Sequence, residues 1–293
     1  MIVLVANPTS GGGKGGRLLP AAVRALAALD DEHRVVVSAS PDHPERAARE
    51  AAAEGVPTVV AMGGDGLISA VANAVVGTGT ALAVVPVGSG NDFARRLGLD
   101  HRRPLEALDL LSSGRRRRID AVLAEGEAWS RHYVCVAGTG FDSVTNEVAN
   151  RIHRLRGTAK YLLAVARTLR SFEPAGFTIR VDGHERETTA MMVAVGNAAS
   201  YGGGMRVVPD ASLDDGILDV CIVGAMSRRR FLAAFPRVYR GTHVTHPDVT
   251  MLRGARVEVE ASKPFPVYAD GEPFGSLPAT FTVQPDALEV IAP

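Results

Sequence analysis

Two different patterns of hydrophobic and polar residues follow one another along the chain. As far as about residue 114, short apolar runs such as MIVLVA and VVAM alternate with longer, alanine-rich segments. Short apolar runs are typical of buried strands, and apolar residues that recur every three or four positions are typical of amphipathic helices. Strands that alternate with helices in this way predict a doubly wound, parallel α/β sheet with right-handed crossover connections.

Extended segments dominate the rest of the chain. Short stretches rich in valine, threonine and aromatic residues are separated by Asp-Gly and other glycine-containing turns, a pattern typical of antiparallel hairpins. We expect helices only near residues 141–172 and 227–240. The sequence therefore predicts an α/β domain at residues 1–118 and a mostly antiparallel β domain at residues 119–293. The arginines at 115–118 are interpreted as a solvated linker, and the final segment ALEVIAP as a candidate strand returning to the first domain.

Composition limits the classes of function. The 293 residues are 46% hydrophobic, which is enough for two packed cores, and 32 Lys and Arg balance 32 Asp and Glu. Without an overall positive field, we expect no nucleic-acid partner. Cys135 and Cys221 lie far apart without metal-ligand spacing, which indicates a reducing compartment. The start of the chain does not resemble a signal peptide, and no apolar run approaches the roughly 18 residues of a spanning helix. We therefore expect a cytoplasmic protein.

A first glycine-rich loop, NPTSGGGKGG, follows the first predicted strand, where an open parallel sheet places its ligands. It combines many backbone N–H groups with Lys14 and Arg17 and leads to a helix N-terminus, which favours anions. A Rossmann interpretation lacks the acid expected after the next strand, and a Walker interpretation fails because Gly15 follows Lys14. A phosphate site and a plain surface turn both remain open.

Two further loops follow later strands of the first domain. The second, MGGDGL, sets Asp65 among glycines, and the third, PVGSGNDF, carries Ser89, Asn91 and Asp92 before a short helix. A buried carboxylate is costly unless a cation or a role in proton transfer compensates for it. Ser89, Asn91 and Asp92 are each good N-cap residues, but one cap suffices for one helix. The sequence therefore predicts further hydrogen bonding in the third loop.

The motifs NPTSG, GGDG, PVGSGNDFAR, VPDASLDDGILDV and VYADGE occur in this order. As an ordered set they resemble the bacterial diacylglycerol kinase and related lipid kinase family over essentially the whole chain. The resemblance implies a phosphofructokinase- or NAD kinase-like domain that binds ATP, followed by a β-sandwich domain. It also implies transfer of the γ-phosphoryl group of ATP, with Mg²⁺, to a lipid hydroxyl. Diacylglycerol, giving phosphatidic acid for phospholipid metabolism, is the first candidate acceptor.

The resemblance further implies roles for individual residues. It places the proton acceptor at Glu272, the metal side of ATP at Asp65, and parts of the catalytic network at Asp92, Arg95 and Asp120. Without the resemblance, the Asp-Gly before Glu272 would be interpreted only as a hairpin turn. The expected ATP contacts lie in the three loops and at one strand end: Asn7, Pro8, Thr9, Ser10, Gly11, Lys14, Arg17, Ser38, Gly63, Gly64, Asp65, Gly66, Leu67, Ser69 and Ser89.

The segment VPDASLDDGILDV carries a second expected metal site. The resemblance places a structural Mg²⁺ at Ser212, Asp215 and Ile217, with Ser212 and Ile217 contributing carbonyl oxygens. Asx-turn chemistry in a hairpin explains the same residues without a metal.

One position departs from the family pattern. Leu67 stands where the family usually has threonine, so a hydroxyl contact worth roughly 1.5–3 kcal/mol is missing. A catalytically impaired lipid-binding member of the family is therefore an alternative to an active lipid kinase. A NAD kinase-like enzyme, with a dinucleotide as acceptor, is a further alternative.

The segment at residues 150–172 mixes leucines with arginines and a lysine. Such a basic amphipathic helix either lies on an anionic bilayer or covers its own domain. A lipid substrate at the membrane surface favours peripheral contact with the inner face of the membrane. The oligomeric state stays open, with a homodimer as one alternative.

Overall fold

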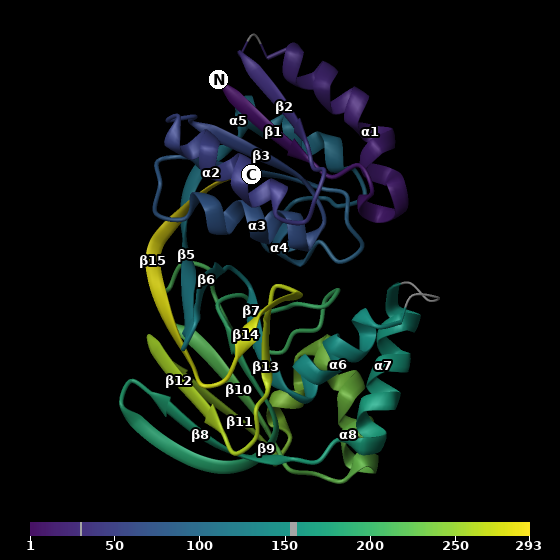
Figure 1. Cartoon of the computed structure of the whole chain (residues 1–293), viewed down its shortest axis with the longest axis vertical. Helices are drawn as coiled ribbons and strands as arrows, with labels where there is room; N and C mark the ends of the chain where they lie inside the picture. The colour runs from purple at the N-terminus through teal and green to yellow at the C-terminus, as the bar shows by residue number, and fades with distance from the viewer. Residues whose placement is uncertain (30, 153–156) are drawn as a thin grey trace. The chain divides into compact units, whose positions relative to one another are not determined.

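The structure, a computed structural model, describes residues 1–29, 31–152 and 157–293, with the side chains of 157–159 left out. The chain forms two compact units (Figure 1). Unit 1 contains Met1–Ala121 and Gln284–Pro293, and unit 2 contains Val122–Val283. The chain passes from one unit to the other within strands β5 (Arg115–Gly126) and β15 (Ala279–Ala292).

Strand β5 corrects one expectation. Residues 115–118 are exposed as expected, but they begin a strand that pairs with β15 and do not form a linker. Arg116 donates to Glu289 of β15 over 2.7 Å, so part of this arginine run is held by its neighbouring strand.

Unit 1 is built on a parallel sheet with the order β2, β1, β3, β4 and the end of β15, where Val290 pairs with Leu82. Its strands are β1 (Ile2–Ala6), β2 (His33–Val37), β3 (Thr58–Gly63) and β4 (Ala81–Pro86). The connecting helices are α1 (Ser10–Ala27), α2 (His43–Ala53), α3 (Asp65–Val75), α4 (Asp92–Arg96), η1 (Pro104–Leu108) and α5 (Leu110–Ser113). The predicted alternation of strands and helices is confirmed.

Alternating residues of the strands in unit 1 pack on the two faces of the sheet. Ile2 and Leu4 of β1 belong to a core that also contains Ala22 and Leu26 of α1 and Leu108 of η1. The opposite face of the sheet is covered by α2 and α3, which pack on each other and on β1, β3 and β4. Successive strand side chains point to opposite faces, so helices on both faces explain why the strands are apolar throughout.

Unit 2 consists mainly of antiparallel strands in the order β14, β13, β7, β9, β8, β12 and β15. The first part of β9 pairs with β8, whereas its second part pairs with β7 and β10. The remaining strands are β6 (Trp129–Tyr133), β7 (Val136–Gly140), β8 (Ala175–Val181), β9 (His184–Gly196), β10 (Leu218–Gly224), β11 (Val249–Gly254), β12 (Arg256–Ala261), β13 (Pro266–Ala269) and β14 (Glu272–Ser276).

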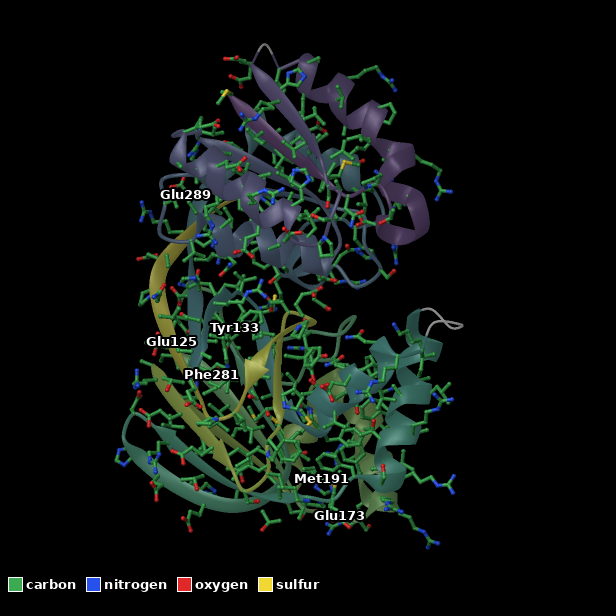
Figure 2. All side chains as sticks on the ribbon, viewed as in Figure 1. Glu125, Tyr133, Glu173, Met191, Phe281 and Glu289 are labelled. Atoms are coloured by element: carbon green, nitrogen blue, oxygen red, sulfur yellow. The ribbon has the colours of Figure 1, made fainter. Side chains whose placement is uncertain are left out.

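The core of unit 2 is apolar and rich in aromatic side chains. Tyr133 and Phe281, labelled in Figure 2, are both buried, and their rings meet edge to face with centroids 6.2 Å apart. The hydroxyl of Tyr133 donates to the carbonyl oxygen of Val195 over 3.0 Å, so its one polar group is satisfied inside the core.

Helices stand beside the strands of unit 2 (Figure 1). They are α6 (Phe141–Asn150), α7 (Gly157–Ser171), α8 (Arg228–Ala234), η2 (Phe235–Arg240) and η3 (Thr242–Thr245). Helix α7 buries Val165 and Leu169 and exposes Leu162 and Arg167, so most of its apolar face covers its own unit. Arg154, Leu155 and Arg156 of the expected amphipathic helix lie outside the described residues. Every helix in the described part of the chain is too short or too polar to span a bilayer.

Two Asp-Gly pairs form the tight turns that the sequence predicts. Asp182 and Gly183 join β8 to β9, and Asp270 and Gly271 join β13 to β14, with φ of 47° and 84° in the first turn and 50° and 85° in the second. Two successive positive φ angles are the conformation of a type I′ hairpin turn, which Asp-Gly favours.

Asp270 also explains why one predicted strand is broken. The segment RHYVCVAGTG reads as one strand, but the structure divides it after Tyr133 into β6 and β7. The carboxylate of Asp270 accepts hydrogen bonds from the backbone N–H groups of Val134, Cys135 and Val136 at 2.9, 2.9 and 3.2 Å. These N–H groups bond to a side chain, so the ladder is interrupted there.

Candidate functional site

The first glycine-rich loop is anchored at the carboxyl end of β1. The backbone N–H of Asn7 donates to the carbonyl of Met62 at the end of β3 over 3.0 Å. The side-chain oxygen of Asn7 accepts from the backbone N–H and the hydroxyl of Thr9 at 2.9 and 2.8 Å. This Asx-type turn fixes the direction in which the loop leaves the sheet.

Three successive glycines give the first loop its path. Gly11, Gly12 and Gly13 have φ of 59°, 67° and 88°, a left-handed run inside the segment assigned to α1. A Cβ on Gly11 would collide with the carbonyl oxygen of Val87, which follows β4. Backbone of the first loop therefore touches backbone of the third, and only glycine permits both the conformation and the approach.

The second and third loops meet in the same way. A Cβ on Gly64 would lie 3.2 Å from the Cα of Gly88, and one on Gly90 would lie 2.5 Å from Oδ2 of Asp65. The motifs NPTSG, GGDG and PVGSGND, separated in sequence, therefore converge at the carboxyl ends of β1, β3 and β4. This is where an open parallel sheet binds its ligands.

The carboxylate of Asp65 joins these two loops. It accepts the backbone N–H of Asn91 at Oδ2 and that of Asp92 at Oδ1, both at 2.8 Å. Asp65 is also the first residue of α3, where the helix dipole favours a negative charge. These two bonds and the helix terminus compensate for the partial burial of Asp65, and each oxygen keeps a second lone pair for a further ligand.

Asn91 closes the third loop but does not cap α4 in the expected way. It lies in the left-handed region, with φ 55° and ψ 41°, and no side-chain cap bond is made at this helix start. Its side-chain oxygen accepts the N–H of Gly88 at 2.9 Å, and its amide donates to the carbonyl of Gly88 at 2.8 Å. Asparagine tolerates this conformation better than most residues. Its side chain does not cap α4, but the further hydrogen bonding that the sequence predicts for the third loop is confirmed.

The other expected ATP contacts lie in or near these loops. Lys14 and Arg17 begin the regular part of α1, Pro8 and Ser10 flank Thr9, and Ser89 is exposed between the glycines of the third loop. Ser38 follows β2, and its backbone N–H donates to the carbonyl of Ala6 over 2.8 Å. The candidate residues of unit 1 at the ends of β1, β3 and β4 are Asn7, Pro8, Thr9, Ser10, Gly11, Gly63, Gly64, Asp65, Gly66, Leu67 and Ser89.

Two of the expected contacts, Leu67 and Ser69, are buried in α3, with 7% and 4% of their surface exposed. Leu67 packs back on its own loop, because a Cβ on Gly63 would lie 2.8 Å from the Cβ of Leu67. The leucine that departs from the family pattern is therefore accommodated as a packing residue.

The expected catalytic residues of unit 1 occupy different surroundings. Arg95 is exposed on α4, and its Nε donates to the carbonyl of Gly90 over 3.1 Å, so it supports the third loop. Asp120 is buried on β5, where its carboxylate accepts the backbone N–H of Asp286 at 3.0 Å. Asp92 is also buried, directly after Asn91.

Glu272 belongs to unit 2 and lies exposed at the start of β14, next to the Asp270-Gly271 turn. Desolvation by the surrounding chain raises the pKa of its carboxyl, and the positive charge of Arg131 lowers it less. The guanidinium of Arg131 lies 4.8 Å from the centroid of the Phe274 ring in the same hairpin. A raised pKa makes the carboxylate a stronger proton acceptor.

The loop at residues 212–217 has the geometry of the Asx-turn alternative. The carboxylate of Asp215 accepts the backbone N–H of Ile217 at 3.2 Å and the guanidinium of Arg253 at 2.8 Å. The hydroxyl of Ser212 donates to Asp214 over 2.7 Å. Arg253 also pairs with Asp219 at 3.2 Å, so one guanidinium is shared by two carboxylates. In the described residues, no group of three or more His, Cys, Asp and Glu side chains is arranged to hold a metal.

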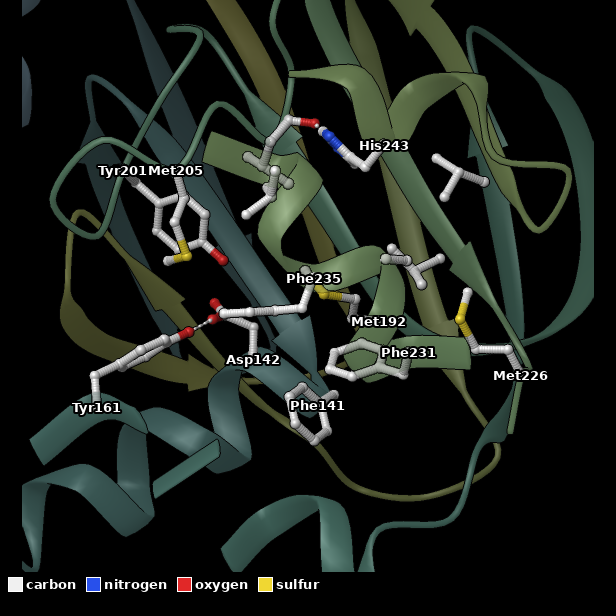
Figure 3. Close-up of a pocket in the computed structure, with 15 residues that line it drawn as sticks. Phe141, Asp142, Tyr161, Met192, Tyr201, Met205, Met226, Phe231, Phe235 and His243 are labelled. Carbon is white, nitrogen blue, oxygen red and sulfur yellow. Dashed lines mark hydrogen bonds between the residues drawn. The ribbon is translucent and has the colours of Figure 1, made fainter. Parts of the chain in front are cut away.

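Unit 2 contains an apolar pocket that the sequence did not predict (Figure 3). The space among its side chains, counted with the part open to solvent, is about 610 Å³. The walls come from α6, α7, β9, β10, α8, η2, η3, β11 and the loops between them: Phe141, Asp142, Tyr161, Met192, Tyr201, Met205, Val207, Val223, Met226, Phe231, Ala234, Phe235, Val238, His243 and Val249. Methionine and aromatic side chains adapt to long, irregular apolar ligands.

Asp142 is the charged group of this pocket. It is 3% exposed, lies in the first turn of α6, and accepts the hydroxyl of Tyr161 at 3.1 Å (Figure 3). Burial raises the pKa of Asp142 to about 6, and hydrogen bonds from Tyr201 and Tyr161 oppose the rise. The sequence did carry a signal for this residue: GTGFD, a strand ending in glycine followed by an acid in the first turn of a helix, repeats the arrangement of GGDG.

Comparison with known proteins agrees with this architecture. The diacylglycerol kinase catalytic domain matches residues 1–124, and the YegS C-terminal NAD kinase beta sandwich-like domain matches residues 135–292. A diacylglycerol kinase of Mycobacterium tuberculosis (strain ATCC 25618 / H37Rv) is 32% identical over 294 residues, covering 100% of this chain and 95% of that protein.

Two solved structures share the fold. A diacylglycerol kinase from Bacillus anthracis strain Sterne matches with a TM-score of 0.76 and 21% identity, covering 100% of this chain and 96% of that chain. A NAD kinase from Archaeoglobus fulgidus in complex with ATP matches with a TM-score of 0.55 and 13% identity, covering 100% and 93%. The predicted fold, an NAD kinase-like α/β domain followed by a β-sandwich domain, is confirmed.

The matched catalytic-domain model places the chain among the kinases. The chain belongs to the bacterial diacylglycerol kinase and YegS-like lipid kinase family, as the resemblance of its motifs indicated.

Proposed function

We propose that this protein transfers the γ-phosphoryl group of ATP to the hydroxyl group of a membrane lipid, with diacylglycerol as the first candidate and phosphatidic acid as its product. The observation that carries this proposal is the apolar pocket of unit 2, since a lipid acceptor needs such a space and a dinucleotide acceptor does not. Water-sized spheres find room for their centres in only about 60 Å³ of the pocket, so a lipid chain would enter by displacing the adaptable methionine and aromatic side chains of its walls.

The chemistry of the pocket walls favours a lipid over NAD. Apart from Asp142, Tyr161, Tyr201 and His243, the lining side chains are aliphatic, aromatic or methionine. The phosphates and riboses of a dinucleotide would lose their hydration there without receiving hydrogen bonds in return. An acyl chain loses nothing by the same transfer and gains about 0.8 kcal/mol for each buried methylene.

The convergent loops of unit 1 support the nucleotide side of the proposal. Backbone N–H groups of the glycine-rich segments and the N-terminus of α3 favour phosphate oxygens, and Lys14 and Arg17 add positive charge beside the first loop. The free lone pairs of the Asp65 carboxylate fit a Mg²⁺ ion that accompanies ATP. When bound, Mg²⁺ would neutralise charge that develops on the transferred phosphoryl group.

The acceptor hydroxyl must lose its proton as the new O–P bond forms. We assign Glu272 to this step, because desolvation raises the pKa of its carboxyl and the family resemblance points to the same residue. Asp65 then acts on the phosphate side by holding the second and third loops together. On this assignment, Leu67 is a packing residue of the second loop, and its presence in place of the family threonine removes no catalytic group.

The test is transfer of labelled phosphate from ATP to diacylglycerol, phosphatidylglycerol, a sphingoid base, a polyprenol and NAD in parallel. Ala234→Trp, which fills the pocket, should lower turnover of the preferred lipid at least tenfold. Ala53→Trp, at an exposed position of α2 in unit 1, serves as the matched control and should leave turnover near that of the wild type. Phosphorylation of NAD alone, or equal turnover by both variants, would overturn the proposal. Lipid binding without transfer would favour the catalytically impaired alternative.

A further inference from the structure

Three large hydrophobic side chains are exposed on helices that also line the apolar pocket. The described residues include five exposed large hydrophobic side chains, namely Met1, Val37, Leu162, Leu232 and Tyr239. Each of the last three comes directly after a residue that lines the pocket: Leu162 follows Tyr161, Leu232 follows Phe231, and Tyr239 follows Val238. Leu162, Leu232 and Tyr239 are 50%, 53% and 42% exposed.

Aromatic rings connect this surface with the interior of the pocket. The rings of Phe141 and Phe231 have centroids 4.7 Å apart, and those of Phe231 and Phe235 are 6.0 Å apart; Figure 3 labels all three residues. The rings of Phe235 and Tyr239 have centroids 6.4 Å apart. Phe141 is 2% exposed, whereas Tyr239 is 42% exposed. The series therefore runs continuously from the buried wall of the pocket to the surface of η2.

Lining residues of the same elements lie at the edge of the pocket, as do Tyr201, Met226 and Val249 on its other walls. Tyr161 of α7, Ala234 of α8, and Phe235 and Val238 of η2 line the pocket and keep part of their surface exposed. A ligand that entered between α7, α8 and η2 would pass the exposed apolar side chains.

The segments that carry this surface are mainly basic. Between Ser227 and His246 the sequence contains five arginines and neither Asp nor Glu, and from Gly157 to Phe172 it contains one lysine and two arginines, again without an acid. Arg230 pairs with Asp248 over 3.1 Å. Arg228, Arg229 and Arg240 are exposed. In a chain whose formal charge is zero, this is a local concentration of positive charge.

We propose that α8 and η2, together with Leu162 of α7, form a docking surface for an anionic lipid bilayer, and that docking sets the opening of the pocket against the membrane. The inference rests on the proposed function in taking the pocket as the acceptor site. Exposed Leu and Tyr side chains insert at the level of the lipid headgroups, and arginines around them attract anionic lipids. An acceptor can then pass from the bilayer into the pocket without crossing water.

A bilayer matches these observations better than a protein partner. The exposed apolar side chains of this surface are few and lie in strongly basic segments, whereas a protein interface has a closely packed, fully buried core. Each arginine near an anionic surface contributes a factor of roughly five to binding, so several weak contacts give reversible attachment.

The experiment is sedimentation of the full chain with vesicles of phosphatidylcholine alone and of equal parts phosphatidylcholine and phosphatidylglycerol. The wild type should bind the anionic vesicles and not the neutral ones. Arg228→Glu with Arg240→Glu should weaken binding at least about 25-fold. Leu232→Ser with Tyr239→Ser should weaken it about tenfold or more. Matched controls are Arg24→Glu and Val37→Ser, which change an exposed arginine and an exposed apolar side chain of unit 1.

A second readout separates docking from catalysis. The variants of α8 and η2 should still phosphorylate a short-chain acceptor dispersed in detergent, but should lose activity towards an acceptor embedded in anionic vesicles. If no lipid is phosphorylated but vesicle binding still depends on Arg228, Arg240, Leu232 and Tyr239, docking stands and the proposed function falls. Equal vesicle binding by the wild type and the α8 and η2 variants overturns the inference. The inference is also overturned if these variants differ from the wild type in self-association, measured by sedimentation velocity, and not in vesicle binding.

Discussion

Replacement of Asp65 by asparagine tests how the second and third loops are held together. In the wild type both carboxylate oxygens accept backbone N–H groups, from Asn91 and from Asp92, at 2.8 Å. Asparagine keeps the volume but offers only one acceptor atom. Its amide nitrogen must then face one of the two backbone N–H groups, so two donors oppose each other.

The size of the effect follows from the bonds that are lost. A hydrogen bond to a charged group contributes about 1.5–3 kcal/mol, and a donor left unsatisfied in a buried position adds to its loss. Because Asp65 is only partly buried, we expect a total of about 2–3 kcal/mol. For a unit of this size, each kcal/mol lowers the Tm by roughly 3–5 °C. Asp65→Asn should therefore lower the Tm of unit 1 by roughly 6–15 °C.

The assay is thermal unfolding of the chain without nucleotide or Mg²⁺, with Ser89→Ala in the exposed part of the same loop as the control. The anchoring role predicts the loss of stability in the absence of any ligand, together with weaker ATP binding both with Mg²⁺ and with a chelator. A purely metal-binding Asp65 predicts normal stability and a loss of ATP affinity only with Mg²⁺. An unchanged Tm in Asp65→Asn refutes the anchoring role.

Three further predictions concern single residues. Glu272→Gln should lower kcat by about 10²–10⁴-fold and leave ATP affinity, measured by calorimetry without lipid, nearly unchanged; turnover within a few-fold of wild type would remove Glu272 from the mechanism. Leu67→Thr should destabilise unit 1 by about 1–2 kcal/mol, because the buried leucine packs on Gly63, with little change in the KM for ATP; a tenfold lower KM would mean that the new hydroxyl reaches the phosphates. Burial raises the pKa of Asp142 to about 6 from 3.8, so wild-type stability should fall as pH rises between about 4 and 6 on account of this group. Asp142→Asn should then be more stable than wild type at pH 8, by up to about 3 kcal/mol, and equally stable below pH 4. The free energy of unfolding of both proteins is measured by chemical denaturation across this pH range. A difference between the two proteins that does not change with pH would contradict the raised pKa.

Much of the fold was within reach of the sequence, because the signals are local. Alternation of apolar runs with amphipathic segments predicted the parallel sheet of unit 1, and Asp-Gly pairs predicted the turns at Asp182 and Asp270. The order of the glycine-rich motifs indicated the family. In each case the information lies within a few neighbouring residues, or in the order of short motifs along the chain.

Errors arose where distant segments compete for the same backbone groups. Asp270 takes the N–H groups of Val134, Cys135 and Val136 and interrupts a segment that by its own pattern is one strand. Residues 115–118 became a strand because β15 supplies a pairing edge. Asn91 turns to Gly88 and does not cap α4, because the left-handed backbone at this position aims its side chain into the loop.

The sequence by itself determined the class of each unit and the motifs of the nucleotide loops, since hydrophobic period and turn chemistry are encoded residue by residue. Only the tertiary structure decided what Asp65 contacts, since its partners lie more than two dozen positions away in the chain. The same holds for the pocket, whose walls come from segments spread between Phe141 and Val249. A cavity is the space that packed elements leave between them, so it depends on how helices and strands meet and has no signature in any one of them.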